Sequence, residues 1–192
     1  MCYLKFSTAF KKSKRLTLYG TSFQVSATMV NCTISENRAV STKPNALYGG
    51  GILATNGANL TMLDCNVRRN FATNEGGGLA FVGAHVHMER CLVTENHALY
   101  GGGLIVDSSS DLSCVETSFI SNEADRGAGI YLGGSSTMSS FVRCTIAFNR
   151  ASKGSGDGLY ITYGTVYLNS SSVYNNTGSG AYFTLRSGAA YG

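Results

Sequence analysis

At 192 residues, with 43% hydrophobic and 14% charged residues, the chain has the length of one folded domain and is too apolar to be disordered. Its 24 glycines beside a single proline, Pro44, indicate many similar turns, as in repeat proteins. Five of the 15 basic residues precede residue 16, and the other ten are balanced by 11 acidic residues. These ten basic residues do not cluster among aromatic residues, which argues against nucleic-acid binding.

The amino-terminal segment, residues 1–22, differs from the rest because it holds a basic run at positions 11–15. We predict that it is a basic leader or an incomplete first coil of the repeats that follow. Residues 1–15 lack the apolar stretch of a signal peptide, and no apolar run in the chain is long enough to span a membrane. We therefore expect that residue 1 is not the natural start and that the chain is a fragment of a longer protein.

Residues 23–192 carry an internal repeat that is marked by one asparagine per repeat. Successive asparagines are 33, 26, 26, 27 and 27 residues apart, and the first spacing is longer because residues 40–48 form an inserted loop. A cluster of glycines or a related small-residue cluster follows each asparagine. The repeating asparagines are Asn37, Asn70, Asn96, Asn122, Asn149 and Asn176.

Alternating apolar residues predict three short β-strands in each repeat. The residues eight and three positions before each asparagine are apolar in all repeats, and the third strand follows the glycine cluster. Strands this short pair with the equivalent strands of the next coil, which makes the sheets parallel, and parallel crossovers are right-handed. We predict an all-β fold, a right-handed parallel β-helix of about six coils of 26–27 residues, in which the asparagines form a buried structural ladder.

The repeat resembles that of the chlamydial polymorphic outer-membrane proteins, which are right-handed β-helices of the pectin-lyase-like superfamily with the signatures Phe-x-x-Asn and Gly-Gly-Ala-Ile. Phe119 and Asn122 match the first signature, and residues 49–52 match the second with glycine in place of alanine. The resemblance covers about residues 25–185. It implies a passenger region of a secreted or cell-surface protein that acts in adhesion. Fold relatives of this kind also include pectate lyases and polygalacturonases.

His85, His87 and Glu89 occupy alternate positions of one predicted strand, which would place two imidazoles and a carboxylate on one face. In the same columns of the neighbouring coils, Asp111 is the single plausible further ligand. We interpret the three residues as a solvated outer face and keep them as weak candidates for a metal site. We therefore expect no metal and no cofactor.

Cysteines recur five residues before four of the asparagines, at Cys32, Cys65, Cys91 and Cys144. Stacked side chains of one column point in parallel and not towards one another. We interpret them as small buried side chains in preference to disulfides.

Charged residues of neighbouring repeats alternate in sign, with Asp64 opposite Arg90 and Glu116 opposite Arg143. This pattern predicts ion pairs between coils and not the paired carboxylates of a lyase or hydrolase. The short connections also leave little chain to build a substrate cleft. We expect no catalytic residues and no enzymatic activity.

One outward-facing column is apolar where a solvated strand face should be polar. Its tyrosines, Tyr131, Tyr160 and Tyr182, are our candidate binding residues. Either another segment of the protein covers this column, or the column is a docking strip for a partner protein or sugar rings. The whole column is Leu53, Ala80, Ile105, Tyr131, Tyr160 and Tyr182.

These patterns favour a non-enzymatic structural or adhesive module of a secreted or cell-surface protein, located outside the cell. The expected partners are a carbohydrate or a surface protein, and not nucleic acid. The alternative is a fragment of a polysaccharide lyase or hydrolase of the pectin-lyase-like fold.

Overall fold

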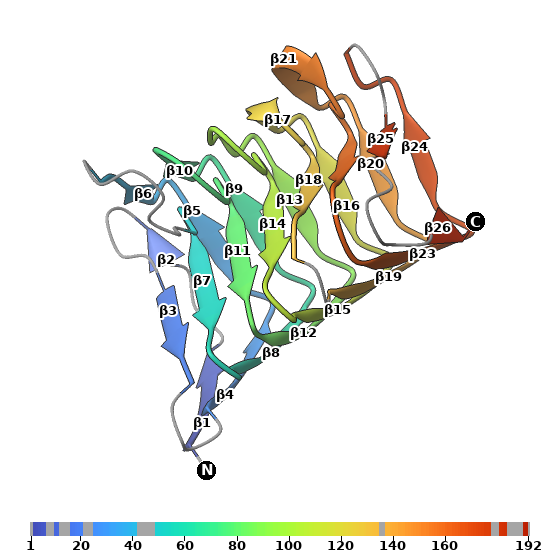
Figure 1. The fold of residues 1–192 in the computed structure, drawn as a ribbon. Helices are drawn as coiled ribbons and strands as arrows, with labels where there is room; N and C mark the ends of the chain where they lie inside the picture. Colours follow the sequence, from blue (N-terminus) through green and yellow to red (C-terminus); the bar gives the residue numbers. More distant parts are fainter. Residues whose placement is uncertain are drawn as a thin grey trace.

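The computed structural model describes residues 2–6, 10–11, 16–20, 25–41, 49–134, 137–177, 181–183 and 190–191. Every regular element of this part of the chain is a β-strand. The strands form three long parallel sheets, which run side by side along one axis as the chain winds from the N-terminal to the C-terminal end (Figure 1). The predicted all-β parallel β-helix is thereby confirmed.

The three long sheets each take one strand from every coil. Sheet 1 has eight strands: β1 (Cys2–Phe6), β4 (Val25–Val30), β8 (Asn59–Leu63), β12 (His85–Glu89), β15 (Asp111–Val115), β19 (Met138–Val142), β23 (Thr165–Asn169) and β26 (Ala190–Tyr191). Sheet 2 has seven: β2 (Phe10–Lys11), β5 (Thr33–Ser35), β9 (Asn66–Arg68), β13 (Leu92–Thr94), β16 (Ser118–Ile120), β20 (Thr145–Ala147) and β24 (Ser172–Tyr174).

Sheet 3 also has seven strands: β3 (Leu16–Tyr19), β7 (Ile52–Thr55), β11 (Leu79–Val82), β14 (Leu104–Asp107), β18 (Ile130–Leu132), β22 (Leu159–Ile161) and β25 (Ala181–Phe183). Two short sheets lie between sheets 2 and 3 along the chain. They pair β6 (Arg38–Ala39) with β10 (Phe71–Ala72) and β17 (Glu123–Arg126) with β21 (Arg150–Ser155).

The expected number of about six coils is too small. Strands β1, β2 and β3 pair with β4, β5 and β7, and β26 pairs with β23 at the other end. These pairings add the strands of residues 2–19 to the stack, ahead of the coil that Asn37 marks.

The core includes the two apolar columns that the sequence predicts, together with the inward-facing residues of sheet 3. Met29, Met62 and Met88 lie opposite one another in sheet 1, and Ile34, Val67 and Val93 do so in sheet 2. All six side chains have 0% exposure. Burying a side chain of this size stabilises the fold by about 1.5–3 kcal/mol, so these columns contribute more than surface ion pairs do.

Buried asparagines form a second kind of column, in which each side-chain amide contacts the coils on both sides. The Oδ1 of Asn96 accepts hydrogen bonds from the backbone N–H and the Nδ2 of Asn70. The Nδ2 of Asn96 donates to the carbonyl of Val67 and to the Oδ1 of Asn122. These four bonds measure 2.9–3.0 Å and use the full capacity of the amide. Amide bonds between neighbouring asparagines link all six rungs, Asn37, Asn70, Asn96, Asn122, Asn149 and Asn176. At the first rung, the Oδ1 of Asn37 has no hydrogen-bond partner among the described residues.

The cysteine column also joins neighbouring coils. The thiols of Cys65 and Cys91 donate to the carbonyls of Met29 and Met62, and Cys144 donates to the carbonyl of Cys114. All cysteines whose side chains the structure describes are free, as predicted. Burial raises the pKa of the Cys114 and Cys144 thiols, which keeps both thiols protonated.

Sharp corners at both ends of the sheet 2 strands from β5 to β24 depend on residues in the left-handed backbone region. Arg90 and Glu95 flank β13 with φ of 49° and 54°. The equivalent residues of the other coils adopt the same conformation although none is glycine. This conformation turns the chain within a single residue, which explains how sheets 1 and 2 can be joined without a loop.

The glycine clusters allow the coils to approach closely. A β-carbon on Gly103 would lie 2.5 Å from the carbonyl oxygen of Gly129 in the next coil. It would also lie 3.0 Å from the Nδ2 of Asn122. Glycine is therefore required next to the asparagine ladder because any side chain would separate two coils.

Candidate functional site

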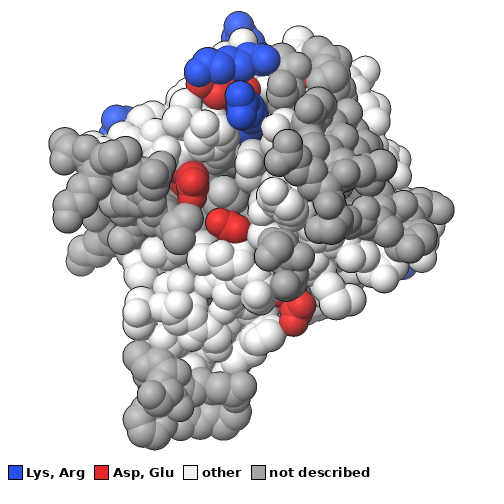
Figure 2. Space-filling view, viewed as in Figure 1, with Lys and Arg blue, Asp and Glu red and all other residues white. Residues whose placement is uncertain are grey.

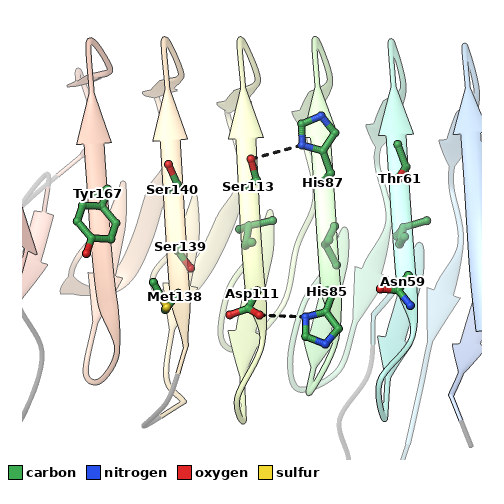
Figure 3. A pocket seen from close by; sticks show the side chains of 13 residues that line it. Asn59, Thr61, His85, His87, Asp111, Ser113, Met138, Ser139, Ser140 and Tyr167 are labelled. Atoms are coloured by element: carbon green, nitrogen blue, oxygen red, sulfur yellow. Dashed lines mark hydrogen bonds and ion pairs between the residues drawn. The ribbon is translucent and has the colours of Figure 1, made fainter. Parts of the chain in front are cut away.

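A shallow trough of about 660 Å³ crosses the outer face of sheet 1. It extends over five neighbouring strands, β8, β12, β15, β19 and β23, and therefore runs along the helix axis (Figure 3). Alternate residues of these strands point into the core, so the residues between them face the trough.

Two rows of side chains border the trough, as Figure 3 shows. The first row is Asn59, His85, Asp111 and Met138, and the second is Thr61, His87, Ser113, Ser140 and Tyr167. Hydroxyl, amide and imidazole groups thus recur at the strand spacing of about 4.8 Å. Met138 and Tyr167 are the most apolar members, with 54% and 40% exposure.

The histidines of β12 lie in this trough, but they do not form the metal site considered from the sequence. The Nδ1 of His85 is 3.0 Å from an Asp111 carboxylate oxygen, and the Nδ1 of His87 is 3.4 Å from the Ser113 hydroxyl. The remaining ring nitrogens point in opposite directions along the strand (Figure 3). Glu89 lies 3.7 Å from the Nε2 of His87 and also contacts Arg90. Among the described residues, no group of three or more His, Cys, Asp or Glu side chains is arranged to hold a metal ion.

The described residues that line the trough include no lysine or arginine, and Asp111 is their single carboxylate. The predicted ion pairs between coils lie at the corners instead. Arg90 contacts Asp64 at 2.7 Å and Arg143 contacts Glu116 at 2.8 Å, which confirms the alternation of charge. The carboxylate of Asp64 has a lowered pKa because Arg90 donates a hydrogen bond to it. The trough is therefore a largely neutral surface beside a charged corner.

The outward-facing apolar column of sheet 3 is largely buried in the structure. Ile105 is 2% exposed and Tyr160 is 8% exposed, while Tyr131 is half-buried. Tyr131 and Tyr160 stack with ring centroids 5.0 Å apart, and Tyr100 meets Tyr131 edge-on at 5.8 Å. The side chain of Tyr182 lies outside the described part of the chain, although its backbone pairs with Tyr160 in sheet 3.

The turns of the chain itself pack against this column. The backbone of Gly127 lies so close that a β-carbon there would be 2.9 Å from the Tyr131 β-carbon. Gly76 has the same relation to Ala80, at 2.8 Å. The first glycines of four clusters thus lie against the outer column, and this packing accounts for its apolar character. These glycines are Gly76, Gly101, Gly127 and Gly156.

Glu75 is a half-buried carboxylate beside this column, and no sequence pattern had indicated it. Burial raises the pKa of Glu75, and repulsion from Asp107 raises it further. One oxygen of Glu75 is buried without a hydrogen-bond partner among the described residues. The two residues belong to different coils and are 32 positions apart, so no local motif brings them together. Figure 2 shows few charged side chains on this face. Most of its basic side chains lie at the upper edge of the view, where Figure 1 places β17 and β21.

Replacing Glu75 by glutamine should raise the melting temperature at neutral pH, because glutamine removes the buried charge. The folded-state pKa of Glu75 lies above the ordinary value of 4.5. The stability that the protonated Glu75 contributes is therefore complete below the ordinary pKa and is lost as the pH rises through the raised pKa. The gain should therefore vanish in acid. Thermal melts of both proteins between about pH 4 and 8 test this, and a gain that persisted unchanged in acid would contradict it.

The stacked parallel sheets and the laddered interior define the molecule as a parallel β-helix. The family model for the right handed beta helix region matches residues 5–191, and the chain belongs to this family. No curated protein and no solved structure gave a match. Within the described residues, there is no helix with the length and apolar character needed to cross a membrane.

Proposed function

We propose that the chain is a non-enzymatic structural and adhesive module of a secreted or cell-surface protein. The observation that carries this proposal is the combination of the buried amide ladder with the periodic outer face of sheet 1. The ladder fixes the register of each coil through buried hydrogen bonds of 2.9–3.1 Å between neighbouring asparagines. A partner that docks on the outer face meets side chains that are already in place, which lowers the entropic cost of binding.

The likeness of the repeat to that of the chlamydial polymorphic outer-membrane proteins supports the same proposal, because it implies adhesion at a cell surface. The partner would be a carbohydrate or a surface protein. Both would use the outer face of sheet 1, where the two rows of the trough offer polar side chains at regular intervals.

A second candidate function is a fragment of a polysaccharide lyase or hydrolase. The observation that favours it is the pair Glu75 and Asp107, since a carboxyl group with a raised pKa beside a second carboxylate is the arrangement used for acid catalysis of glycoside cleavage.

Two measurements distinguish the two functions: retention of the protein on solid supports and its turnover of polysaccharides. We expect the purified protein to be retained on cell-wall, host-cell or polysaccharide supports, and to release no product from polygalacturonate or alginate in the presence of calcium. Product release is followed by ultraviolet absorbance and by reducing-end assay. Turnover that is absent from heat-killed controls and disappears in Glu75→Gln or Asp107→Asn would establish the enzyme and refute the adhesive module.

A further inference from the structure

The trough has the shape of a site for an extended molecule. Five strands contribute to it, so four strand spacings of about 4.8 Å give it a length of about 19 Å. Its rows run perpendicular to the strands, and each coil repeats nearly the same positions. A linear polymer lying along the helix axis would therefore meet a similar set of groups at every step.

The chemistry of the rows excludes several polymers. An acidic polysaccharide or a nucleic acid needs cations, and the described lining has no lysine or arginine. An extended peptide would bring backbone donors and acceptors to a sheet face whose own backbone groups are already paired between coils. A lipid would leave the hydroxyls of Thr61, Ser113 and Ser140 without partners.

Neutral sugars fit the groups that are present. Their hydroxyls both donate and accept hydrogen bonds, as do the serine, threonine, histidine and asparagine side chains of the two rows. The apolar faces of sugar rings stack on aromatic side chains, and Tyr167 presents such a ring at one end of the trough. Met138 offers an apolar contact in the opposite row.

We propose that the trough on sheet 1 binds a neutral linear glycan, aligned with the axis of the β-helix across five coils. This inference rests on the proposed adhesive function and names its ligand class. The hydroxyl and imidazole row from Thr61 to Tyr167 hydrogen-bonds successive sugar residues, and Ser113 lies at its centre.

The test compares two serine substitutions in one coil. Ser113 and Ser118 are both half-buried and face outward, but Ser113 lines the trough on β15 while Ser118 lies on β16 in sheet 2. Arginine at Ser113 fills the trough, whereas arginine at Ser118 adds the same charge elsewhere. The probes are cellohexaose, mannohexaose, xylohexaose and chitohexaose, with oligogalacturonate as the acidic comparison, and binding is measured by calorimetry.

We expect at least one neutral hexasaccharide to bind, Ser113→Arg to weaken it by about tenfold or more, and Ser118→Arg to leave it unchanged. Melting curves show that both variants are folded. Equal loss in the two variants would place the site elsewhere, and tighter binding of oligogalacturonate by the wild type would assign the trough to acidic glycans. Either result overturns the inference.

Failure of this inference differs from failure of the proposed function. If no neutral glycan binds but the protein adheres to cells and Ser113→Arg abolishes adhesion, the ligand class is wrong and the adhesive module stands. If the wild type does not adhere to any support, both proposals fall.

Discussion

Replacing Asn96 by leucine is expected to lower the free energy of unfolding by about 3 kcal/mol, because several buried groups lose their partners at once. The carbonyl of Val67 and the backbone N–H of Asn70 both bond to this amide. The side chains of Asn70 and Asn122 lose one bond each as well. Leucine is branched at the same position and is larger than asparagine, so it leaves no cavity, and the loss reports the hydrogen bonds together with the fit of the larger side chain. Denaturant melts with an unchanged slope measure it.

The control for this substitution is Arg90→Ala, which removes an exposed ion pair with Asp64 in the neighbouring coil. Surface pairs of this kind are weak and are screened by salt, so its effect should be clearly smaller. Equal losses in the two variants would show that the asparagines do not act as an internal ladder.

Replacing Gly103 by alanine is the second change with a large expected effect. The new β-carbon would lie 2.5 Å from the carbonyl oxygen of Gly129, so the two coils must move apart next to the Asn122 amide. Overpacking of this kind costs about 1–3 kcal/mol, and here the obstacle is backbone that cannot rotate away, which places the loss at the upper end.

Gly57→Ala provides the matched control. Gly57 has a φ of +77°, yet a β-carbon there would have no neighbour within 4 Å. Its expected cost is the strain of a left-handed alanine, about 1 kcal/mol. Thermal melts compare the two variants, and a greater loss at Gly57 would mean that backbone conformation, not coil spacing, determines the need for glycine.

The regular part of the fold was predictable because each column keeps one chemical character from coil to coil. Met62 and Val67 alternate with polar residues, and Asn70 recurs at a nearly constant interval, so strand order and parallel pairing follow. The backbone conformation of the corner residues was not predictable from the sequence. Residues such as Arg90 adopt positive φ without the glycine that normally signals it, since tertiary packing imposes the turn.

The site was less predictable than the fold. His85 and His87 were recognised as neighbours on one face, but their orientation depends on Asp111 and Ser113 in the next coil. The burial of Tyr160 follows from turns whose path no local pattern reveals. The raised pKa of Glu75 likewise depends on its burial and on the approach of Asp107, neither of which can be derived from the sequence.

The asparagine ladder has a direction. From Asn37 to Asn149, each Nδ2 donates to the Oδ1 of the asparagine in the following coil, so every link of the ladder runs the same way. The amide dipoles therefore add head to tail along the axis, and each bond polarises the next. The asparagine ladder is therefore a directional polar column within an apolar core. Its direction distinguishes one end of the stack of coils from the other, independently of the surface charges.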